Sequence, residues 1–263
     1  MTQPLVNVAV QAARKAGDLT HRYLSRLDRI PITEKARHDY VSEVDRACEV
    51  EIVREIRRLY PNHAFLAEES GATGDSDHVW IIDPLDGTSN YLHGIPHYAI
   101  SIALQIKGRT EHAVVYDPVR EELFTASRGR GAVLNNQKLR VSPRKGLSGS
   151  ILATALPFRQ RDKLDTSMAV LGDIFSQVED IRRAGAASLD LAYVAAGRVD
   201  GYWEIGLQPW DVAAGALLVR EAGGVVQDFS GNDTVETSGT IIAAPFKLMT
   251  PLQRIINSHW RQD

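Results

Sequence analysis

Two carboxylates follow an apolar segment in the first third of the chain. Residues 79–82, Val-Trp-Ile-Ile, run directly into the string Asp83-Pro84-Leu85-Asp86-Gly87-Thr88. Pro84 lacks an amide donor and is expected to end the strand's pairing, so that Asp83 and Asp86 converge on one point. The Leu85 carbonyl is free to face that point, and oxygen ligands of this kind select hard cations such as Mg²⁺. Asp-Pro or Asp-Gly alone would indicate a turn, whereas the full string predicts a metal site with amides nearby for an anion.

Further acidic positions are candidates for the same point. Glu68 and Glu69 end the apolar segment 65–67, although a lone Glu-Glu pair is usually solvated surface. Because Glu68 lies fifteen positions before Asp83, the two strand ends are expected to be neighbours. Asp211 opens a strongly apolar helix, where an isolated Asp would serve as an N-cap worth about 1 kcal/mol. The second predicted helix is preceded or opened by three further polar residues, Asp39, Ser42 and Asp45.

The elements that must position these residues are predicted from the spacing of apolar side chains. Helices are predicted at residues 4–25, 42–60, 164–175, 186–196, 211–222 and 246–260. Strands are predicted at residues 65–67, 79–82, 99–106, 113–115, 123–126, 151–155, 201–205, 225–227 and 241–243. Residues 142–149 are the best internal boundary, which gives two packed halves, 1–145 and 146–263, in one catalytic unit. Strands that come first and then alternate with helices indicate an α+β fold rather than a Rossmann domain.

Composition excludes several classes of protein. The 263 residues carry 30 Lys and Arg against 33 Asp and Glu, a net charge of −3, which argues against a strongly basic nucleic-acid binder. The one cysteine, Cys48, excludes a disulfide framework and a cysteine-based zinc site. We expect a cytoplasmic protein without a membrane partner, because no signal peptide is visible and no apolar segment approaches about 18 residues.

The order and spacing of these motifs resemble the inositol monophosphatase family, within the lithium-sensitive, magnesium-dependent phosphatase superfamily. The matching segments are Glu-Glu-Ser at 68–70, the string at 83–88, and Trp-Asp-Val-Ala-Ala-Gly at 210–215. Residues 192–201 and 219–224 are similar to the bacterial SuhB-like branch of the family. The resemblance implies a layered α/β/α/β/α sandwich of the inositol monophosphatase and fructose bisphosphatase type.

The resemblance also implies a role for each acidic position. A first Mg²⁺ would be held by Glu68, Asp83 and the Leu85 carbonyl, and a second by Asp83, Asp86 and Asp211. Asp45 with Glu68 would serve a third, weaker ion and its water, which Thr88 and Asp45 would orient and deprotonate. Lys35 and Glu69 are supporting residues.

The substrate contacts implied by the resemblance come from both halves of the chain. The phosphate would meet Gly87, Thr88 and Ser89, and the alcohol would meet Gly185, Ala186, Ala187 and Glu204. Further substrate-binding positions are Leu85, Asp86, Arg183 and Asp211, although Arg183 could instead pair at a subunit interface. Ala186 is a departure, because family members commonly carry a hydroxyl residue at that position. Ser188 follows two positions later and is expected to face a different side of its helix.

Carboxylates brought to one point require cations on physical grounds alone. The five concerned are those of Asp45, Glu68, Asp83, Asp86 and Asp211. Two unit charges about 4 Å apart repel by roughly 4 kcal/mol at an effective dielectric constant of 20. Divalent ions would supply the missing positive charge, activate water and stabilise the leaving alkoxide. Phosphoryl transfer of this kind needs no Ser or Cys nucleophile, since it depends on positioning and charge neutralisation.

These features predict a Mg²⁺-dependent phosphate monoester hydrolase, with inositol 1-monophosphate as the first expected substrate. Three other substrates stay open, namely fructose bisphosphate, a phosphoadenosine nucleotide and histidinol phosphate. The motifs concern the binding of phosphate and metal and not of the alcohol. The resemblance implies a homodimer and inhibition by lithium. It also leaves a role of another class open, since SuhB-type proteins are linked to antitermination through transcription elongation factors and RNA.

Overall fold

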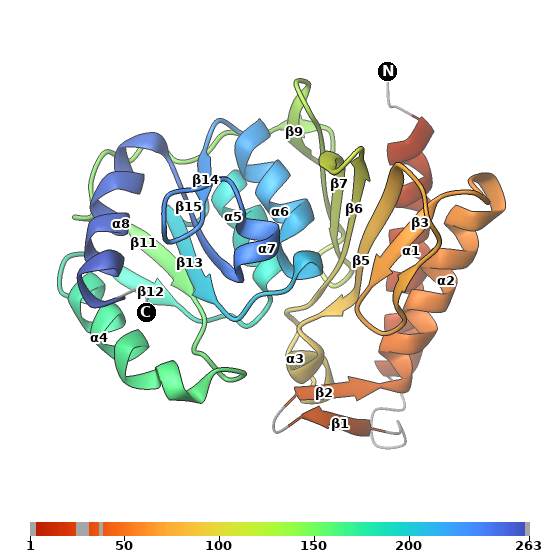
Figure 1. The fold of residues 1–263 in the computed structure, drawn as a ribbon, viewed down its shortest axis with the longest axis horizontal. Helices are drawn as coiled ribbons and strands as arrows, with labels where there is room; N and C mark the ends of the chain where they lie inside the picture. Colours follow the sequence, from red (N-terminus) through yellow and green to blue (C-terminus); the bar gives the residue numbers. More distant parts are fainter. Residues whose placement is uncertain (1–3, 25–31, 37–38, 261–263) are drawn as a thin grey trace.

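Five layers of helices and sheets lie side by side along the long axis of the molecule (Figure 1). The computed structural model describes residues 4–24, 32–36 and 39–260, and of residues 32–36 and 39–42 it describes the backbone alone. From one end, the layers are α1 and α2, an eight-stranded sheet, α5 and α6, a five-stranded sheet, and α4 with α8. These helices span Pro4–Leu24, Glu43–Leu59, Ala187–Ala195, Pro209–Glu221, Leu164–Phe175 and Phe246–His259. The α/β/α/β/α sandwich implied by the resemblance is confirmed.

The eight-stranded sheet uses only strands from the first part of the chain. In spatial order it contains β10 (Gln137–Lys138), β9 (Gly131–Leu134), β8 (Glu122–Ser127), β7 (Arg109–Asp117), β6 (Ala99–Ile106), β5 (His78–Asp86), β3 (Ala64–Ala67) and β4 (Gly71–Thr73). Strands β3 and β5 run parallel, so their carboxyl ends meet at one edge region, and the other neighbours are antiparallel. Helices α1 and α2 cover one face through a core that includes Ile52, Trp80 and Ile100.

The five-stranded sheet is built from residue 151 onward. Its order is β12 (Asp180–Arg182), β11 (Ile151–Thr154), β13 (Gly201–Ile205), β15 (Thr240–Ala244) and β14 (Val225–Gln227). The predicted boundary at 142–149 falls between the two sheets, although the division into halves 1–145 and 146–263 stays a prediction. A two-stranded sheet pairs β1 (Ile32–Ala36) with β2 (Asp39–Ser42). None of the described helices is both long and apolar enough to cross a membrane.

Helices α5 and α6 are buried because a sheet covers them on both sides. In α6 every residue from Asp211 to Val219 is buried, so the helix has no solvated face. Gly215 lets α5 approach closely, since a Cβ atom at this position would lie 2.5 Å from Cβ of Leu191. The two helices that carry part of the site are therefore held at a fixed, short separation.

We expect Gly215→Ala to lower the free energy of unfolding by about 1–3 kcal/mol, because the added methyl group overpacks the α5–α6 contact. Gly172→Ala is the matched control, since a Cβ atom at Gly172 in α4 meets nothing within 4 Å. The control should be neutral or stabilising by up to about 1 kcal/mol, through helix propensity. Chemical denaturation of both variants checks this, and equal stability of the two would contradict the packing argument.

Most predicted elements are present, but three differences affect the site. Strand β5 continues to Asp86, and Pro84 interrupts its pairing instead of ending it, because the ladder resumes at Asp86 and Ala99. A short helix, α3 (Thr88–Leu92), follows at residues for which no helix or strand was predicted. Helix α6 begins at Pro209, so Asp211 is its third residue and not its N-cap. The short elements β1, β2, β4, β9, β10, β12 and α7 (Val235–Ser238) were also missed.

Candidate active site

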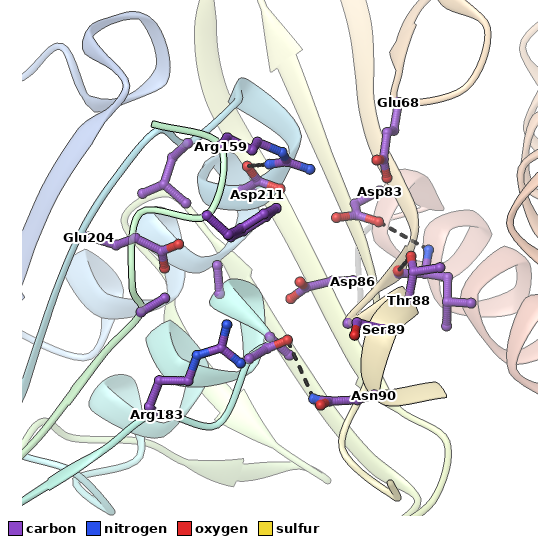
Figure 2. Close-up of a pocket in the computed structure, with 18 of the residues that line it drawn as sticks. Glu68, Asp83, Asp86, Thr88, Ser89, Asn90, Arg159, Arg183, Glu204 and Asp211 are labelled. Atoms are coloured by element: carbon purple, nitrogen blue, oxygen red, sulfur yellow. Dashed lines mark hydrogen bonds and ion pairs between the residues drawn. The ribbon is translucent and has the colours of Figure 1, made fainter. Parts of the chain in front are cut away.

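A cavity of about 470 Å³ lies where the end of β5 faces the beginnings of α5 and α6 (Figure 2). Its walls come from both sheets, so neither half of the chain forms it alone. The lining residues are Glu68, Asp83, Leu85, Asp86, Gly87, Thr88, Ser89, Asn90, His93, Ala155, Phe158, Arg159, Arg161, Arg183, Gly185, Ala186, Ala187, Glu204, Leu207 and Asp211. The cavity therefore contains most of the residues that the sequence predicts for the site.

The parallel pair β3–β5 brings Glu68 beside Asp83. Ala67 is opposite Ile82 in the ladder, and the Glu68 amide donates to the Ile82 carbonyl at 3.1 Å. The expectation that the two strand ends are neighbours is thereby confirmed. Asp83 is almost fully buried, and one of its oxygens, Oδ1, accepts from the Leu85 amide at 3.0 Å.

Thr88 links the pocket to Asp45, which lies buried at the start of α2. The Thr88 hydroxyl lies 2.7 Å from Oδ1 of Asp45 and 3.0 Å from the Leu85 carbonyl oxygen, and it can donate to either. Asp45 does not line the cavity itself, so it acts on the pocket through Thr88. The predicted pairing of Thr88 with Asp45 is present in the structure.

Gly87 turns the chain sharply into α3. Its φ is +93°, and a Cβ atom there would lie 3.0 Å from the carbonyl oxygen of His97, so other residues would be strained. The turn places the Asn90 side chain between the two halves, where its Nδ2 donates to the carbonyls of His97 at 2.8 Å and Ala184 at 2.9 Å. Asn90 therefore fixes the segment that leads into Gly185.

Asp86 is held from across the pocket by Ser188. The Ser188 amide donates to Oδ2 of Asp86 at 2.7 Å, and the Ser188 hydroxyl donates to the same oxygen. Burial raises the pKa of Asp86 to about 6, although these hydrogen bonds oppose the increase. This contact of Ser188 with Asp86 was not predicted from the sequence.

We expect Ser188→Ala to cost about 1.5–3 kcal/mol of stability when Asp86 is ionised, because a charge-assisted hydrogen bond is lost. The loss should be smaller at acidic pH, where Asp86 is protonated. Urea denaturation at pH 5 and pH 8 without added metal measures both values. Ser148→Ala is the control, since Ser148 is exposed, and surface changes usually stay within 0.5 kcal/mol. A loss independent of pH would contradict this account.

Asp211 forms a capping box with Gln208 at the start of α6 and faces an arginine. Its Oδ2 accepts from the Gln208 amide at 2.7 Å, which fixes the carboxylate at the beginning of α6. The same oxygen lies 3.7 Å from Nη1 of Arg159, and Figure 2 marks this ion pair. Arg159 was not predicted, because its segment carries no motif and reaches Asp211 only in the folded chain.

Glu204 lies on β13 and accepts a hydrogen bond from the Tyr202 hydroxyl. Burial raises the pKa of Glu204 to about 8, opposed by this hydrogen bond and reinforced by the charges of Asp211 and Asp86. The neighbouring Asp190 is also buried, and burial together with the charge of Glu204 raises its pKa well above the usual range. This side of the pocket therefore favours protonated carboxyl groups at neutral pH.

Asp83 is buried among other negatively charged side chains of the pocket. Burial raises its pKa well above the usual range, and the charges of Glu68, Asp86 and Asp211 raise it further. Within the part of the chain that the structure describes, no group of three or more His, Cys, Asp or Glu side chains is already arranged to enclose an ion. The carboxylates therefore share a pocket without forming a closed cage, and it is their oxygen chemistry that fits a hard divalent cation.

The structure brings together nearly all the predicted metal-binding and substrate-binding residues. Asp45 reaches the pocket through Thr88, and Glu69 stands outside it, with its amide donating to Oε2 of Glu49 at 2.8 Å. The side chain of Lys35 lies outside the described residues. The pocket residues that the sequence did not predict are Asn90, His93, Ala155, Phe158, Arg159, Arg161 and Leu207.

Comparison with known proteins gives the same family as the sequence motifs. The family model described as "Inositol monophosphatase family" matches residues 1–261. A Pseudomonas aeruginosa protein described as Nus factor SuhB is 55% identical over 263 residues, covering 98% of this chain and 97% of its own. The extragenic suppressor protein suhB of Bartonella henselae has a TM-score of 0.94 at 44% identity, covering 97% and 99% of the two chains. The inositol monophosphatase of Anabaena (Nostoc) sp. PCC 7120 has a TM-score of 0.86 at 38% identity, covering 98% and 99%. The chain belongs to the inositol monophosphatase family and has its phosphatase fold.

Proposed function

We propose that this protein is a Mg²⁺-dependent hydrolase of small phosphate monoesters, with inositol 1-monophosphate as the reference substrate. The observation that carries the proposal is the buried pair Asp83 and Asp86, which shares one pocket with Glu68 and Asp211. These carboxylates raise one another's pKa, so the ionised set needs divalent cations. The alternatives named above, fructose bisphosphate, a phosphoadenosine nucleotide and histidinol phosphate, would use the same pocket.

The carboxylates divide into two overlapping ligand sets. Glu68, Asp83 and the Leu85 carbonyl would hold one ion, and Asp83, Asp86 and Asp211 would hold another. A third, weaker ion would lie near Asp45 and Glu68. Bound there, divalent ions lower the pKa of water and neutralise charge on the phosphoryl group and the leaving oxygen.

The remaining chemistry belongs to side chains of the pocket. Thr88 would hold the attacking water, and Asp45, 2.7 Å from the Thr88 hydroxyl, would receive its proton. The water oxygen forms a bond to phosphorus, the bond from phosphorus to the ester oxygen breaks, and the alcohol leaves after taking a proton from solvent. Gly87 and Ser89 lie on the same wall and would position the phosphate, while Gly185, Ala187 and Glu204 would face the alcohol.

A phosphate-release panel tests the proposal directly. With millimolar Mg²⁺ we expect turnover of inositol 1-monophosphate, and the same assay would rank fructose bisphosphate, a phosphoadenosine nucleotide and histidinol phosphate. The activity should vanish with chelator, return on adding Mg²⁺, and fall with millimolar lithium. No release from any of these esters would refute the proposed function.

A binding role beside catalysis is the second candidate, and the relatives described as Nus factors favour it. Such a role would use a surface and partners such as transcription elongation factors or RNA, and not the carboxylates. Asp86→Asn should therefore keep any such binding while losing hydrolysis. Failure of immobilised protein to retain elongation factors at modest salt would remove this candidate. The homodimer stays a prediction, which analytical ultracentrifugation can check.

A further inference from the structure

Residues 184–188 of the second half are hydrogen-bonded to the first half at both ends of the segment. At one end the Ser188 amide donates to Oδ2 of Asp86 at 2.7 Å, and at the other end Ala184 accepts from Asn90 at 2.9 Å. Between these two points, residues 185–187 line the pocket, where they would face the alcohol of the substrate. The position of the alcohol-facing segment is therefore set by two side chains of the first half.

Asn90 holds the end of the segment that begins at Ala184. Its Nδ2 donates to the carbonyls of His97 at 2.8 Å and Ala184 at 2.9 Å, and the Gly185 carbonyl lies 3.4 Å away. A dashed line in Figure 2 marks the last of these contacts, which runs from Asn90 to the opposite side of the pocket. Asn90 is only 8% exposed, so water cannot readily replace these bonds if the amide is removed.

The backbone of the segment also packs tightly against this amide. Gly185 has a φ of +89°, and a Cβ atom there would lie 3.3 Å from Nδ2 of Asn90 and 2.9 Å from Nη1 of Arg183. A side chain at this position would push the segment away from Asn90. Hydrogen bonding from one side and the small size of glycine on the other thus fix one short separation.

The groups that would bind the phosphate do not depend on the Asn90 side chain. Asp86 is paired with Ala99 in the ladder between β5 and β6, and the Thr88 hydroxyl lies 2.7 Å from Oδ1 of Asp45. The Asn90 carbonyl accepts from the Ile95 amide at 2.8 Å, a backbone bond that any residue at position 90 can form. Loss of the amide should therefore release the alcohol-facing segment and leave the phosphate-binding groups in place.

We propose that Asn90 is a positioning residue that sets the selectivity of the pocket for the alcohol. By holding Ala184 and Gly185 against the first half, it fixes the distance between the alcohol-facing segment and the phosphate site. The inference rests on the proposed function, and it names the contact through which that same pocket distinguishes one alcohol from another. The competing explanation is a purely structural bond, whose loss would lower activity toward every ester alike.

Inositol 1-monophosphate and glycerol 2-phosphate are the probes, because both are phosphate monoesters but the three-carbon alcohol can reach less of residues 185–187. With Mg²⁺ we expect the wild type to favour the inositol ester about tenfold or more in kcat/KM. Asn90→Leu keeps the approximate shape of the side chain but has no donor, and it should reduce that ratio about fivefold, mainly by raising KM for the inositol ester. A ratio measured on one preparation does not depend on its folded fraction, so partial unfolding cannot imitate the effect.

Gln105→Leu is the matched control, because it removes another amide donor that joins the two halves. Gln105 on β6 donates through Nε2 to Glu236 on α7, 131 positions away, and neither residue lines the pocket. Its ratio should stay within about twofold of wild type. Gly185→Ala approaches the same contact from the second half and should also reduce the ratio. The double variant with Asn90→Leu should lie within about twofold of the more severe single variant, since both changes release one segment.

The remaining outcomes separate the inference from the proposed function. An unchanged ratio in Asn90→Leu, equal losses for both esters, or a wild type without preference for the inositol ester would overturn the positioning role. Effects that multiply fully in the double variant would also overturn it, because the two residues would then act independently. No phosphate release from either ester by the wild type would instead refute the proposed function.

Discussion

Asp86→Asn should abolish Mg²⁺-dependent phosphate release, with kcat/KM reduced about a thousandfold or more. Asp86 is a proposed ligand of the second ion, and the amide keeps its shape but removes the charge that a hard cation requires. The Ser188 amide and hydroxyl currently donate to Oδ2 of Asp86, and an asparagine carbonyl oxygen can accept the same bonds. The variant is therefore expected to fold, and initial rates of phosphate release measure the loss.

Asp190→Asn is the matched control for this experiment. Asp190 is also a buried acid near the pocket, but it does not line the cavity, and burial raises its pKa well above the usual range. An amide resembles a protonated carboxyl group, so the control should keep kcat/KM within about tenfold of wild type. Wild-type activity in Asp86→Asn would show that the metal assignment is wrong.

Ion-free protein should lose stability as the pH rises from about 4 to 8. Burial raises the folded-state pKa of Asp86 to about 6 and of Glu204 to about 8, above the usual 3.8 and 4.5. A raised pKa means that the folded state binds protons more tightly than the unfolded state does. The stability gained from this proton binding is fully present below the unfolded-state pKa. It is lost as the pH rises through the folded pKa, over about 3.8–6 for Asp86 and 4.5–8 for Glu204, amounting to a few kcal/mol.

Added Mg²⁺ should reverse this trend, because ion binding requires the ionised carboxylates and stabilises the folded state. Thermal unfolding with chelator or with 10 mM Mg²⁺ across pH 5–8 measures the effect, and the gain in Tm from Mg²⁺ should be largest at pH 8. Glu204→Gln should flatten the fall between pH 6 and 8 in the ion-free protein. A Tm that rises with pH in the presence of chelator would contradict the claim that burial raises the pKa values of Asp86 and Glu204.

Local patterns predicted the α+β class and the acidic strand ends of the pocket, whereas the layered sandwich came from the resemblance to the family. Apolar spacing located the helices and most of the larger strands, and the string at 83–88 placed Asp83 and Asp86 at a strand end. The position of Asp211 was predicted, but the start of α6 was not, since the Gln208–Asp211 capping interaction begins the helix two residues earlier. Pro84 was expected to end the strand, yet pairing resumes at Asp86 because Ala99 lies opposite it on β6.

The residues that the sequence missed act through contacts between distant segments. Ser188 lies 102 positions from Asp86, and nothing in either local pattern indicates that they meet. Arg159 follows β11 and faces Asp211 only because α6 begins beside it. Asn90 lies two residues after the string at 83–88, but its hydrogen bond to Ala184 requires two segments 94 positions apart to be in place. Tertiary structure, and not propensity, decides these contacts.

The two-sheet assembly also sets an order of events during synthesis. The strands of the eight-stranded sheet are complete by residue 138, so Asp83 and Asp86 can reach their places before residue 188 is made. At about 5–20 residues per second, Ser188 follows Asp86 from the ribosome by roughly 5–20 seconds. During that interval the nascent chain carries Asp83 and Asp86 without Ser188, which supplies two hydrogen-bond donors to Asp86. Closure of the pocket is therefore expected late in folding, because Glu204 and Asp211, which also line it, are made after Ser188.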